Sequence, residues 1–239
     1  MKANEHETRR APHSAARAAK RWIDVAAALV GLTAAAPVLG AAALAVRAAM
    51  GPPVLFRHTR PGLRGEPFEL LKLRTMRPPR PGENLEEDEG HRITRLGQVL
   101  RATSIDELPG LWNVLRGDMS LVGPRPLLME YMERYTPAQA RRHDVRPGLT
   151  GWCQINGRNA RDWDTKLALD TWYVDNWSLG LDLRILARTP LVVLRREGIS
   201  HHTDSTSPVF RGSSEARDEP ASRPSSHSAA PSSDGALRR

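Results

Sequence analysis

The feature that most restricts how this chain can fold is a run of residues without a single charge, Val25–Val46. As an α-helix this run would be about 33 Å long, which is close to the thickness of a bilayer's hydrocarbon core. A straight transmembrane helix is the simplest interpretation. A re-entrant hairpin, which enters and leaves the membrane on the same face, is the alternative.

Two details favour the hairpin. Pro37 lies in the middle of the run, where it removes a backbone hydrogen bond and kinks a helix. Basic residues flank the run on both sides, and these are Arg17, Lys20 and Arg21 before it and Arg47, Arg57, Arg60 and Arg64 after it. Because Lys and Arg accumulate in cytoplasmic flanks, equal flanks suit a segment whose two ends emerge on the cytoplasmic face. The residues alone leave both interpretations open.

Asp24 precedes the apolar run, at the predicted membrane edge. A carboxylate in that position costs free energy unless it is paired. Arg21 or Arg47 could pair with it, or its head could remain in water as an interfacial charge.

Charge and cysteine content narrow the classes of partner. The formal net charge is +8, which suits an anionic partner such as a nucleotide or a phospholipid surface. The basic residues are spread over the arm, the loops and the helices without a reader motif, so we expect no nucleic-acid partner. The single cysteine, Cys153, excludes an intramolecular disulfide and a Cys-rich zinc site.

Composition divides the chain into four parts. Residues 1–19 are polar and basic and are predicted to form a disordered arm, and residues 20–50 hold the membrane segment. Residues 51–200 are predicted to form one globular domain. Residues 201–239 are rich in Ser, Pro and Ala, so they cannot bury a core and are predicted to be a disordered tail.

Within residues 51–200 the patterns predict a mostly helical α+β fold. Val54–Arg57 and Phe68–Leu73 are predicted strands around a Gly-rich turn. Lys72 and Arg74 are two residues apart and so project to one face, where they could hold a diphosphate or form a solvated basic edge. Apolar residues at helical spacing predict helices over residues 93–100, 163–174 and 179–196. Residues 127–135 and 137–142 are also predicted helices, the second with Thr136 as its N-cap and Pro137 at its first position.

Aromatic residues and a polar loop mark the C-terminal half. Trp172, Tyr173 and Trp177 could form an aromatic belt at the membrane interface or could be core residues. The loop 146–159 crowds polar groups, including Arg158, among glycines, which suits close approach to a ligand.

Asp106 and Glu107 are an adjacent pair of carboxylates in the centre of the stretch 101–126. Ser104 and Glu107 have the spacing of a capping box, which predicts a helix that begins at Ser104. Asp106 would then lie in the first turn, where free N–H groups and the helix dipole favour negative charge and also favour a phosphate. An ordinary helix cap is the competing interpretation.

Several long motifs resemble one family in the same order. They are Lys20-Arg21-x-x-Asp24, GPPVLFRHTRPGLRGEPFELLKLRTM (51–76), RITRLGQVLRATSIDELPGLWNVLRGDMSLVGPRPL (92–127), RPGLTGWCQINGRN (146–159) and LDTWYVDNWSLGLDLRIL (169–186). The chain resembles the bacterial sugar transferases, the monotopic polyprenyl-phosphate phosphoglycosyl transferases, from about Lys20 to Leu194. It is similar to their small, minimal form.

The resemblance implies a fold, a reaction and a location. The fold is a re-entrant helix-break-helix with the break at Pro37, plus a small cytoplasmic catalytic domain with amphipathic interfacial helices at the inner membrane. The reaction transfers a sugar 1-phosphate from a UDP-sugar to polyprenyl (undecaprenyl) phosphate with Mg²⁺ and releases UMP, which starts the assembly of a surface glycan such as an exopolysaccharide. The oligomeric state stays open, with a homodimer among the options.

The resemblance also assigns the site. Asp106 is the nucleophile that forms a covalent phosphosugar intermediate, and Glu107, with Asp106, is the expected Mg²⁺ ligand. The residues implied in substrate binding are Lys72, Arg101, Arg125, Arg158 and Asp170. The chemistry is consistent, since a carboxylate can carry a transferred phosphoryl group, and two adjacent carboxylates call for a cation. Arginines offer paired donors to phosphate oxygens.

Two other functions compete with this reaction. Glycoside hydrolysis needs two carboxylates about 5 to 10 Å apart on either side of the sugar, which adjacent residues do not readily supply. The remaining alternative is a catalytically inactive, membrane-tethered scaffold or anionic-ligand binding protein.

Overall fold

A computed structural model of the chain describes residues 10–81, 83, 89–156, 162–194 and 209–212. It is a mostly helical α+β fold, as the sequence predicted, and it contains two small sheets. The α-helices and strands, in chain order, are α2 (Arg10–Met50), β1 (Leu55–Pro61), β2 (Pro67–Leu73), α3 (Glu89–Arg92), α4 (Arg95–Ala102), α5 (Gly110–Arg116), β3 (Ser120–Val122), α6 (Pro137–Ala140), β4 (Gly148–Thr150), α7 (Trp152–Ile155), α8 (Trp163–Asp175) and α9 (Leu179–Leu194). Short 3₁₀ turns join them, namely η1 (Leu63–Gly65), η2 (Ile105–Glu107), η3 (Met129–Arg134) and η4 (Arg141–Asp144).

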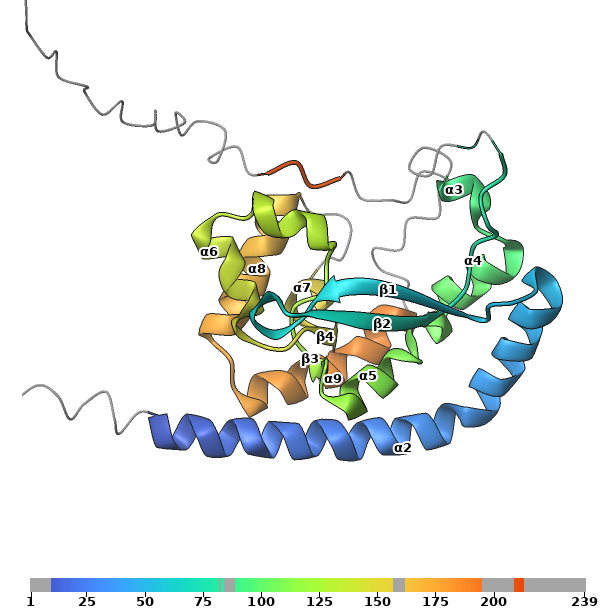
Figure 1. The fold of residues 1–239 in the computed structure, drawn as a ribbon. Coiled ribbons are helices and arrows are strands. Elements are labelled where there is room, and N and C mark those ends of the chain that lie inside the picture. The colour runs from blue at the N-terminus through green and yellow to red at the C-terminus, as the bar shows by residue number, and fades with distance from the viewer. Residues whose placement is uncertain (1–9, 82, 84–88, 157–161, 195–208, 213–239) are drawn as a thin grey trace, which may run out of the picture.

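Helix α2 is 41 residues long and contains Pro37. Figure 1 shows that it runs along one side of the domain and then curves toward α4. Its stretch Ala15–Met50 is long and apolar enough to cross a membrane. Residues 10–19 belong to this helix, so the predicted disordered arm is wrong for them, because their alanines favour helix.

Two parts of α2 are bonded to the globular domain that follows it. Near its start, Lys20 Nζ donates to Asp182 Oδ2 at 2.7 Å, and Arg21 donates to the carbonyls of Val114 and Leu115. At its end, Arg74 donates to the carbonyls of residues 50, 51 and 52. Arg74 therefore closes the C-terminal end of α2, and these carbonyls take the donors that the sequence analysis offered to a diphosphate or to solvent.

Asp24 does not pair with Arg21 or Arg47. It is buried, and its Oδ1 accepts a hydrogen bond from the Leu121 backbone N–H at 3.0 Å. Because α2 lies against β3 at this point, a backbone donor of the domain takes the place that water or an arginine was expected to fill.

The β1–β2 hairpin is antiparallel and pairs Leu55 with Leu73 and Pro61 with Pro67. Its two strands confirm the predicted ones and extend β1. The second sheet pairs β3 and β4 in parallel through Ser120–Gly148 and Val122–Thr150. These three-residue strands were not predicted, since they are too short to show a period.

The core joins elements that are far apart in the sequence. Its main cluster includes Leu111 and Val114 of α5, Val122 of β3, Tyr173 of α8 and Ile185 of α9. Ala28 of α2 belongs to the same cluster. Ala42 and Val46 of α2 pack with Leu73 and Leu100 in a second cluster.

The aromatic residues near α9 belong mainly to the core. Tyr173 is fully buried, and its hydroxyl donates to Asp182 Oδ1 at 2.7 Å. Trp177 Nε1 donates to Asp182 Oδ2 at 3.1 Å. Trp172 is half-exposed and stacks on Trp152. The predicted aromatic belt at the membrane interface is therefore wrong for Tyr173, which is a core residue.

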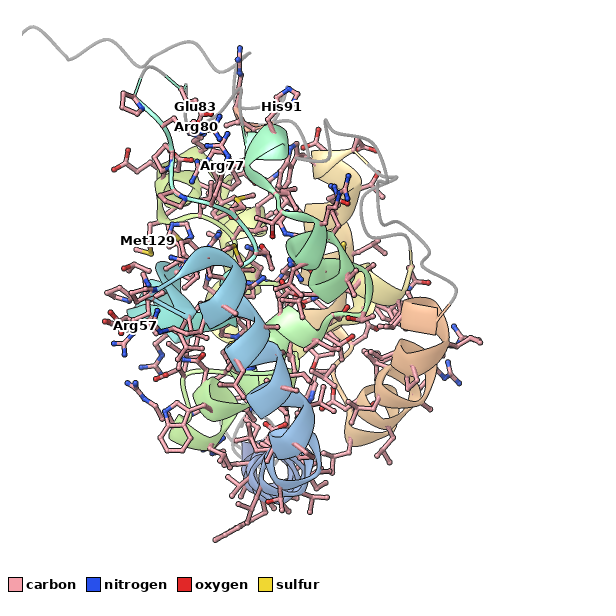
Figure 2. All side chains as sticks on the ribbon, turned by 90° about the vertical axis from the view of Figure 1, so that its right-hand side faces the viewer. Arg57, Arg77, Arg80, Glu83, His91 and Met129 are labelled. Atoms are coloured by element: carbon pink, nitrogen blue, oxygen red, sulfur yellow. The ribbon has the colours of Figure 1, made fainter. Side chains whose placement is uncertain are left out.

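The described part of the segment between β2 and α3 is held together by charge. Arg77 Nη1 donates to Glu83 Oε2 at 2.7 Å, and the Arg80 backbone N–H donates to the same oxygen at 2.8 Å. Figure 2 shows these three side chains gathered beside α3. The Arg77 bond lowers the pKa of Glu83 to about 2.

Two other expectations need correction. The predicted helix over 127–135 is the 3₁₀ segment η3. In the predicted disordered tail, residues 209–212 are described, and Phe210 is buried. Composition could not reveal one anchoring aromatic ring.

Candidate active site

Asp106 and Glu107 lie in η2, between α4 and α5. The predicted capping box is absent, since Ser104 has a left-handed backbone (φ 56°) and its side chain makes no capping bond. Pro109 explains this, because it lacks the N–H that would continue an α-helix from Ile105. Helix α5 therefore begins only at Gly110, and Asp106 does not lie at its first turn.

The two carboxylates of the pair have different surroundings. Glu107 Oε1 accepts hydrogen bonds from Lys72 Nζ at 2.8 Å and from Arg125 Nη2 at 2.7 Å. Asp106 is only 6% exposed, and its Oδ1 is buried without a hydrogen-bond partner. The structure thus holds Glu107 in place and leaves an oxygen of Asp106 unsatisfied.

Lys72 reaches the pair from β2. Asn113 of α5 ties that strand in place, because its Oδ1 accepts from the Leu71 N–H at 3.0 Å and its Nδ2 donates to the Glu69 carbonyl at 2.7 Å. Asn113 is fully buried. Its amide thus takes the place of a neighbouring strand, and this fixes the depth of Lys72 relative to η2.

Arg125 reaches the pair from the loop after β3. Gly123 begins this loop, and its N–H donates to the Thr150 carbonyl at 2.9 Å. A Cβ at Gly123 would lie 2.3 Å from the Arg146 carbonyl oxygen, so only glycine allows this approach. Arg142 Nη2 then donates to the Arg125 carbonyl at 2.6 Å, which fixes the main chain behind the Arg125 side chain.

Arg101 comes from the last turn of α4, where its Nε donates to Thr75 Oγ1 at 3.0 Å. Its charge acts on Asp106 together with those of Lys72 and Arg125. The structure therefore brings Lys72, Arg101 and Arg125 around Asp106 and Glu107, as the sequence predicted.

Burial and neighbouring charges shift the pKa values of three site residues. Burial, followed by the neighbouring Glu107, raises the pKa of Asp106 from 3.8 to about 6, against the three cations. Burial lowers the pKa of Lys72, and Glu107 opposes this shift. Glu107 is the main cause of the raised pKa of Arg125. At neutral pH, Asp106 is therefore an ionised carboxylate in a desolvated position, which is a suitable state for a nucleophile.

Asp170 does not contact this pair. Its Oδ2 accepts from Arg142 Nη2 at 2.7 Å and from Arg142 Nε at 3.2 Å, and both side chains are buried. Among the described residues, Arg142 and the Arg125 carbonyl link Asp170 to the site, so Asp170 supports the site in this structure. Arg158 lies outside the described residues.

The residues fit a divalent cation of the Mg²⁺ type. In the described part of the chain, no group of three or more His, Cys, Asp or Glu side chains could hold a metal. However, Mg²⁺ is commonly held by one or two carboxylates with the remaining positions filled by water and substrate phosphates. The unsatisfied Oδ1 of Asp106 beside Glu107 is the kind of donor that such an ion needs.

Comparison with known proteins shows the family to which this chain belongs. The sequence model of the bacterial sugar transferase family matches residues 15–196. The chain belongs to the bacterial sugar transferase family. This membership confirms the resemblance seen in the sequence and the prediction that the protein is a sugar transferase enzyme.

Three relatives illustrate the match. The transferase is 52% identical over 195 residues to an uncharacterized sugar transferase, EpsL, of Bacillus subtilis (strain 168), covering 81% of this chain and 96% of that protein. It is 45% identical over 188 residues to a UDP-glucose:undecaprenyl-phosphate glucose-1-phosphate transferase of Caulobacter vibrioides, covering 74% of this chain and 70% of that protein. It is 41% identical over 197 residues to an exopolysaccharide production protein, ExoY, of Rhizobium meliloti (strain 1021), covering 74% and 87%.

The structure also shows residues of this transferase that sequence reasoning missed. Arg142 is nearly fully buried, although it lies in a run of charged residues that looks exposed. Asn113 had a weak signal, since it is a polar residue among the apolar residues of α5. Neither could be placed without its partner from a distant part of the chain.

Proposed function

We propose that this protein transfers a sugar 1-phosphate from a UDP-sugar to polyprenyl phosphate through a covalent intermediate on Asp106. Relatives that carry a specific name support this reaction, since one is named for glucose 1-phosphate transfer to undecaprenyl phosphate. The relative named for exopolysaccharide production supports a role in the assembly of a surface glycan.

One observation carries the proposal more than any other. Asp106 Oδ1 is buried without a hydrogen-bond partner, beside three cations that act on its charge. An unsatisfied buried carboxylate oxygen costs stability. Such a cost is expected where an oxygen must be available to a substrate phosphorus, and it has no use in a purely structural site.

In the first step, an oxygen of the Asp106 carboxylate attacks the phosphorus that bears the sugar. The new bond joins this oxygen to phosphorus, and the bond from that phosphorus to the bridging oxygen breaks, so UMP leaves with the electron pair. Lys72, Arg101 and Arg125 provide positive charge for the phosphate oxygens. A Mg²⁺ ion held by Glu107 and Asp106 would add further charge stabilisation on these oxygens.

In the second step, a phosphate oxygen of the polyprenyl phosphate attacks the phosphorus of the intermediate. The bond between Asp106 and phosphorus breaks, which restores the carboxylate and yields a polyprenyl diphosphate sugar. Because two displacements replace one, each substrate meets the same cations in turn.

The placement of α2 supports a re-entrant arrangement at the cytoplasmic face of the inner membrane. Lys20 and Arg21 near its start and Met50 at its end are bonded to one domain. A straight helix over the 30 residues from Lys20 to Met50 would separate them by about 45 Å, across a whole bilayer. Cysteines placed at Ala3 and Pro53 should therefore be labelled from the same side in cells, and labelling from opposite sides would establish a spanning helix.

The reaction is tested with purified protein, vesicles that contain undecaprenyl phosphate, Mg²⁺ and a panel of UDP-sugars. We expect a lipid diphosphate sugar and one equivalent of UMP from at least one donor. Release of UDP would indicate direct glycosyl transfer and would contradict the proposal. If every donor is inert while the protein still binds UDP-sugars, the inactive scaffold becomes the better account.

A further inference from the structure

A short segment near the C-terminus returns to the catalytic domain. Residues 209–212 form the red segment of Figure 1, and Phe210 within it is only 1% exposed. The segment follows the end of α9 at Leu194 and lies beyond residue 196, where the family match ends. Phe210 therefore lies outside the residues that match the family model.

Phe210 is held by both its ring and its backbone. Its ring centroid lies 5.5 Å from those of Tyr131 and Trp163 and 5.6 Å from that of Tyr135, on which it stacks. Its N–H donates to the Tyr131 hydroxyl at 3.2 Å. Its carbonyl accepts from Arg134 Nη1 at 2.5 Å. Aromatic pairs with satisfied backbone groups indicate a defined seat, unlike a loose apolar contact.

The seat continues directly to the active site. Arg142 Nη1 donates to the Tyr135 hydroxyl at 3.2 Å, and the Arg142 guanidinium lies 5.7 Å from the centre of the Tyr135 ring. Arg142 Nη2 donates to the Arg125 carbonyl at 2.6 Å. Arg125 in turn binds Glu107 at 2.7 Å. Each neighbour in this series is joined by a hydrogen bond or a ring contact.

We propose that Phe210 is a positioning residue for phosphosugar transfer: stacked on Tyr135, it keeps Arg142 on the main chain of Arg125 and so keeps the Arg125 guanidinium at Glu107. This inference rests on the proposed function for its kinetic consequence. It assigns a catalytic purpose to a part of the chain that lies outside the family match.

The physical reason is the burial of Arg142, which is 2% exposed. Without the Phe210 ring, the face of Tyr135 is open and water can reach the guanidinium. Hydration competes with the hydrogen bonds of Arg142 to Tyr135 and to the Arg125 carbonyl. The Arg125 loop is then less constrained, and misplacement by about 1 Å can slow a reaction by about 100-fold.

The first test compares Phe210→Ala with Val209→Ala in the full-length protein. Val209 is 43% exposed and lies in the same segment, so it is a matched control. Each variant is mixed with Mg²⁺ and a UDP-sugar that the wild type accepts, without lipid, and the phosphosugar adduct is followed by intact mass spectrometry. We expect the rate constant of Phe210→Ala to fall about 10- to 100-fold, with nearly every molecule still forming the adduct. Val209→Ala should match the wild type.

Rate constant and amplitude separate positioning from folding. If Phe210 only stabilises the fold, fewer molecules form the adduct while those that do react at the wild-type rate, and this result would overturn the proposal. Should Phe210→Ala be too unstable to purify, Phe210→Leu retains an apolar side chain and replaces it. A wild-type rate constant in Phe210→Leu would equally contradict the role of stacking on Tyr135.

A second measurement does not depend on the reaction. Hydrogen exchange should be about 10-fold faster in Phe210→Ala than in Val209→Ala at two amides that anchor the Arg125 loop. These are the Gly123 N–H, which donates to the Thr150 carbonyl, and the Gly148 N–H, which donates to the Pro124 carbonyl. Exchange in β2 should be unchanged. Unchanged exchange at both glycines would refute the link between Phe210 and Arg125, whereas a wild type that forms no adduct would refute the proposed function alone.

Discussion

Asp106 and Asp170 are both buried carboxylates of the same domain, 6% and 4% exposed, and burial raises the pKa of both. Asp170 receives two hydrogen bonds from the buried guanidinium of Arg142. Asp106 has three cations nearby, yet its Oδ1 has no hydrogen-bond partner. Both regions therefore bury a carboxylate, but only the Asp170 carboxylate has hydrogen bonds from an arginine, whereas Asp106 Oδ1 has none.

The difference separates a structural charge from a reactive one. The two hydrogen bonds from Arg142 offset part of the desolvation of Asp170, so this pair can hold the Arg125 loop without a substrate. No hydrogen bond offsets the desolvation of Asp106 Oδ1. We expect a substrate or a cation to interact with this oxygen. Stability and activity should therefore respond in opposite directions to changes at the two sites.

The largest effect is expected for the chemistry at Asp106. Asp106→Asn removes the anionic nucleophile, so turnover should fall roughly 10⁴-fold or more. Asp170→Asn leaves the nucleophile in place and should reduce turnover far less per folded molecule. UMP release, measured for each variant at equal folded concentration, checks this order, and similar losses in both variants would erase the distinction.

The next effect concerns the stability of the Arg142–Asp170 pair. Asp170→Asn leaves the Arg142 charge buried without its carboxylate and should lower the free energy of unfolding by about 3–5 kcal/mol. Urea unfolding in detergent measures this change. The double substitution Arg142→Met with Asp170→Leu should recover much of the loss, since it removes both charges. A loss below about 1 kcal/mol for Asp170→Asn would mean that the pair is not the closed structural unit described above.

Asp106 should behave in the opposite way. Its folded pKa of about 6 is above its usual value of 3.8, so ionisation destabilises the folded state as pH rises from about 4 to 6. Asp106→Asn should therefore raise the free energy of unfolding by about 1–3 kcal/mol at pH 8 with EDTA present. The gain should shrink as the pH falls from 6 to 4. A variant that is less stable than the wild type at pH 8 would show that Asp106 is a satisfied group.

The smallest effect is expected at an exposed ion pair. Arg57 Nη1 lies 3.4 Å from Glu69 Oε2, and the two side chains are 64% and 54% exposed. Arg57 is labelled in Figure 2, apart from the Arg77 loop. Arg57→Gln should change the free energy of unfolding by less than about 0.5 kcal/mol. A thermal melt of this variant therefore calibrates the larger changes, and a loss comparable to that of Asp170→Asn would undermine the contrast between exposed and buried pairs.

The sequence predicted the local features well where a pattern repeats. The hairpin strands, α4 and the two C-terminal helices follow from alternation or helical spacing, and α6 follows from its Thr136 cap. The family motifs also predicted that Lys72, Arg101 and Arg125 belong to the same site as Asp106 and Glu107, and the folded chain brings these five residues together. This agreement has a physical basis, because charged residues in an apolar domain need partners.

The predictions that were wrong concern features without a repeating pattern. Each of these features depends on one distant contact or on one missing hydrogen-bond donor. Ser104 has the sequence of a cap, yet the missing N–H of Pro109 stops the helix before it starts. Asp24 bonds to Leu121, almost a hundred positions later in the chain. Phe210 is one ring within a stretch whose composition indicates disorder. No periodicity encodes such contacts, so only the folded chain reveals them.

The central claim is that Asp106 carries the phosphorylated sugar. The most direct measurement mixes the enzyme with Mg²⁺ and an accepted UDP-sugar in the absence of lipid, then records intact mass and UMP together. The account predicts a mass increase equal to one sugar phosphate, located on Asp106 by peptide fragmentation, with an equal amount of UMP. If UMP appears only after polyprenyl phosphate is added, and no adduct forms in an enzyme that turns over, the covalent mechanism is contradicted.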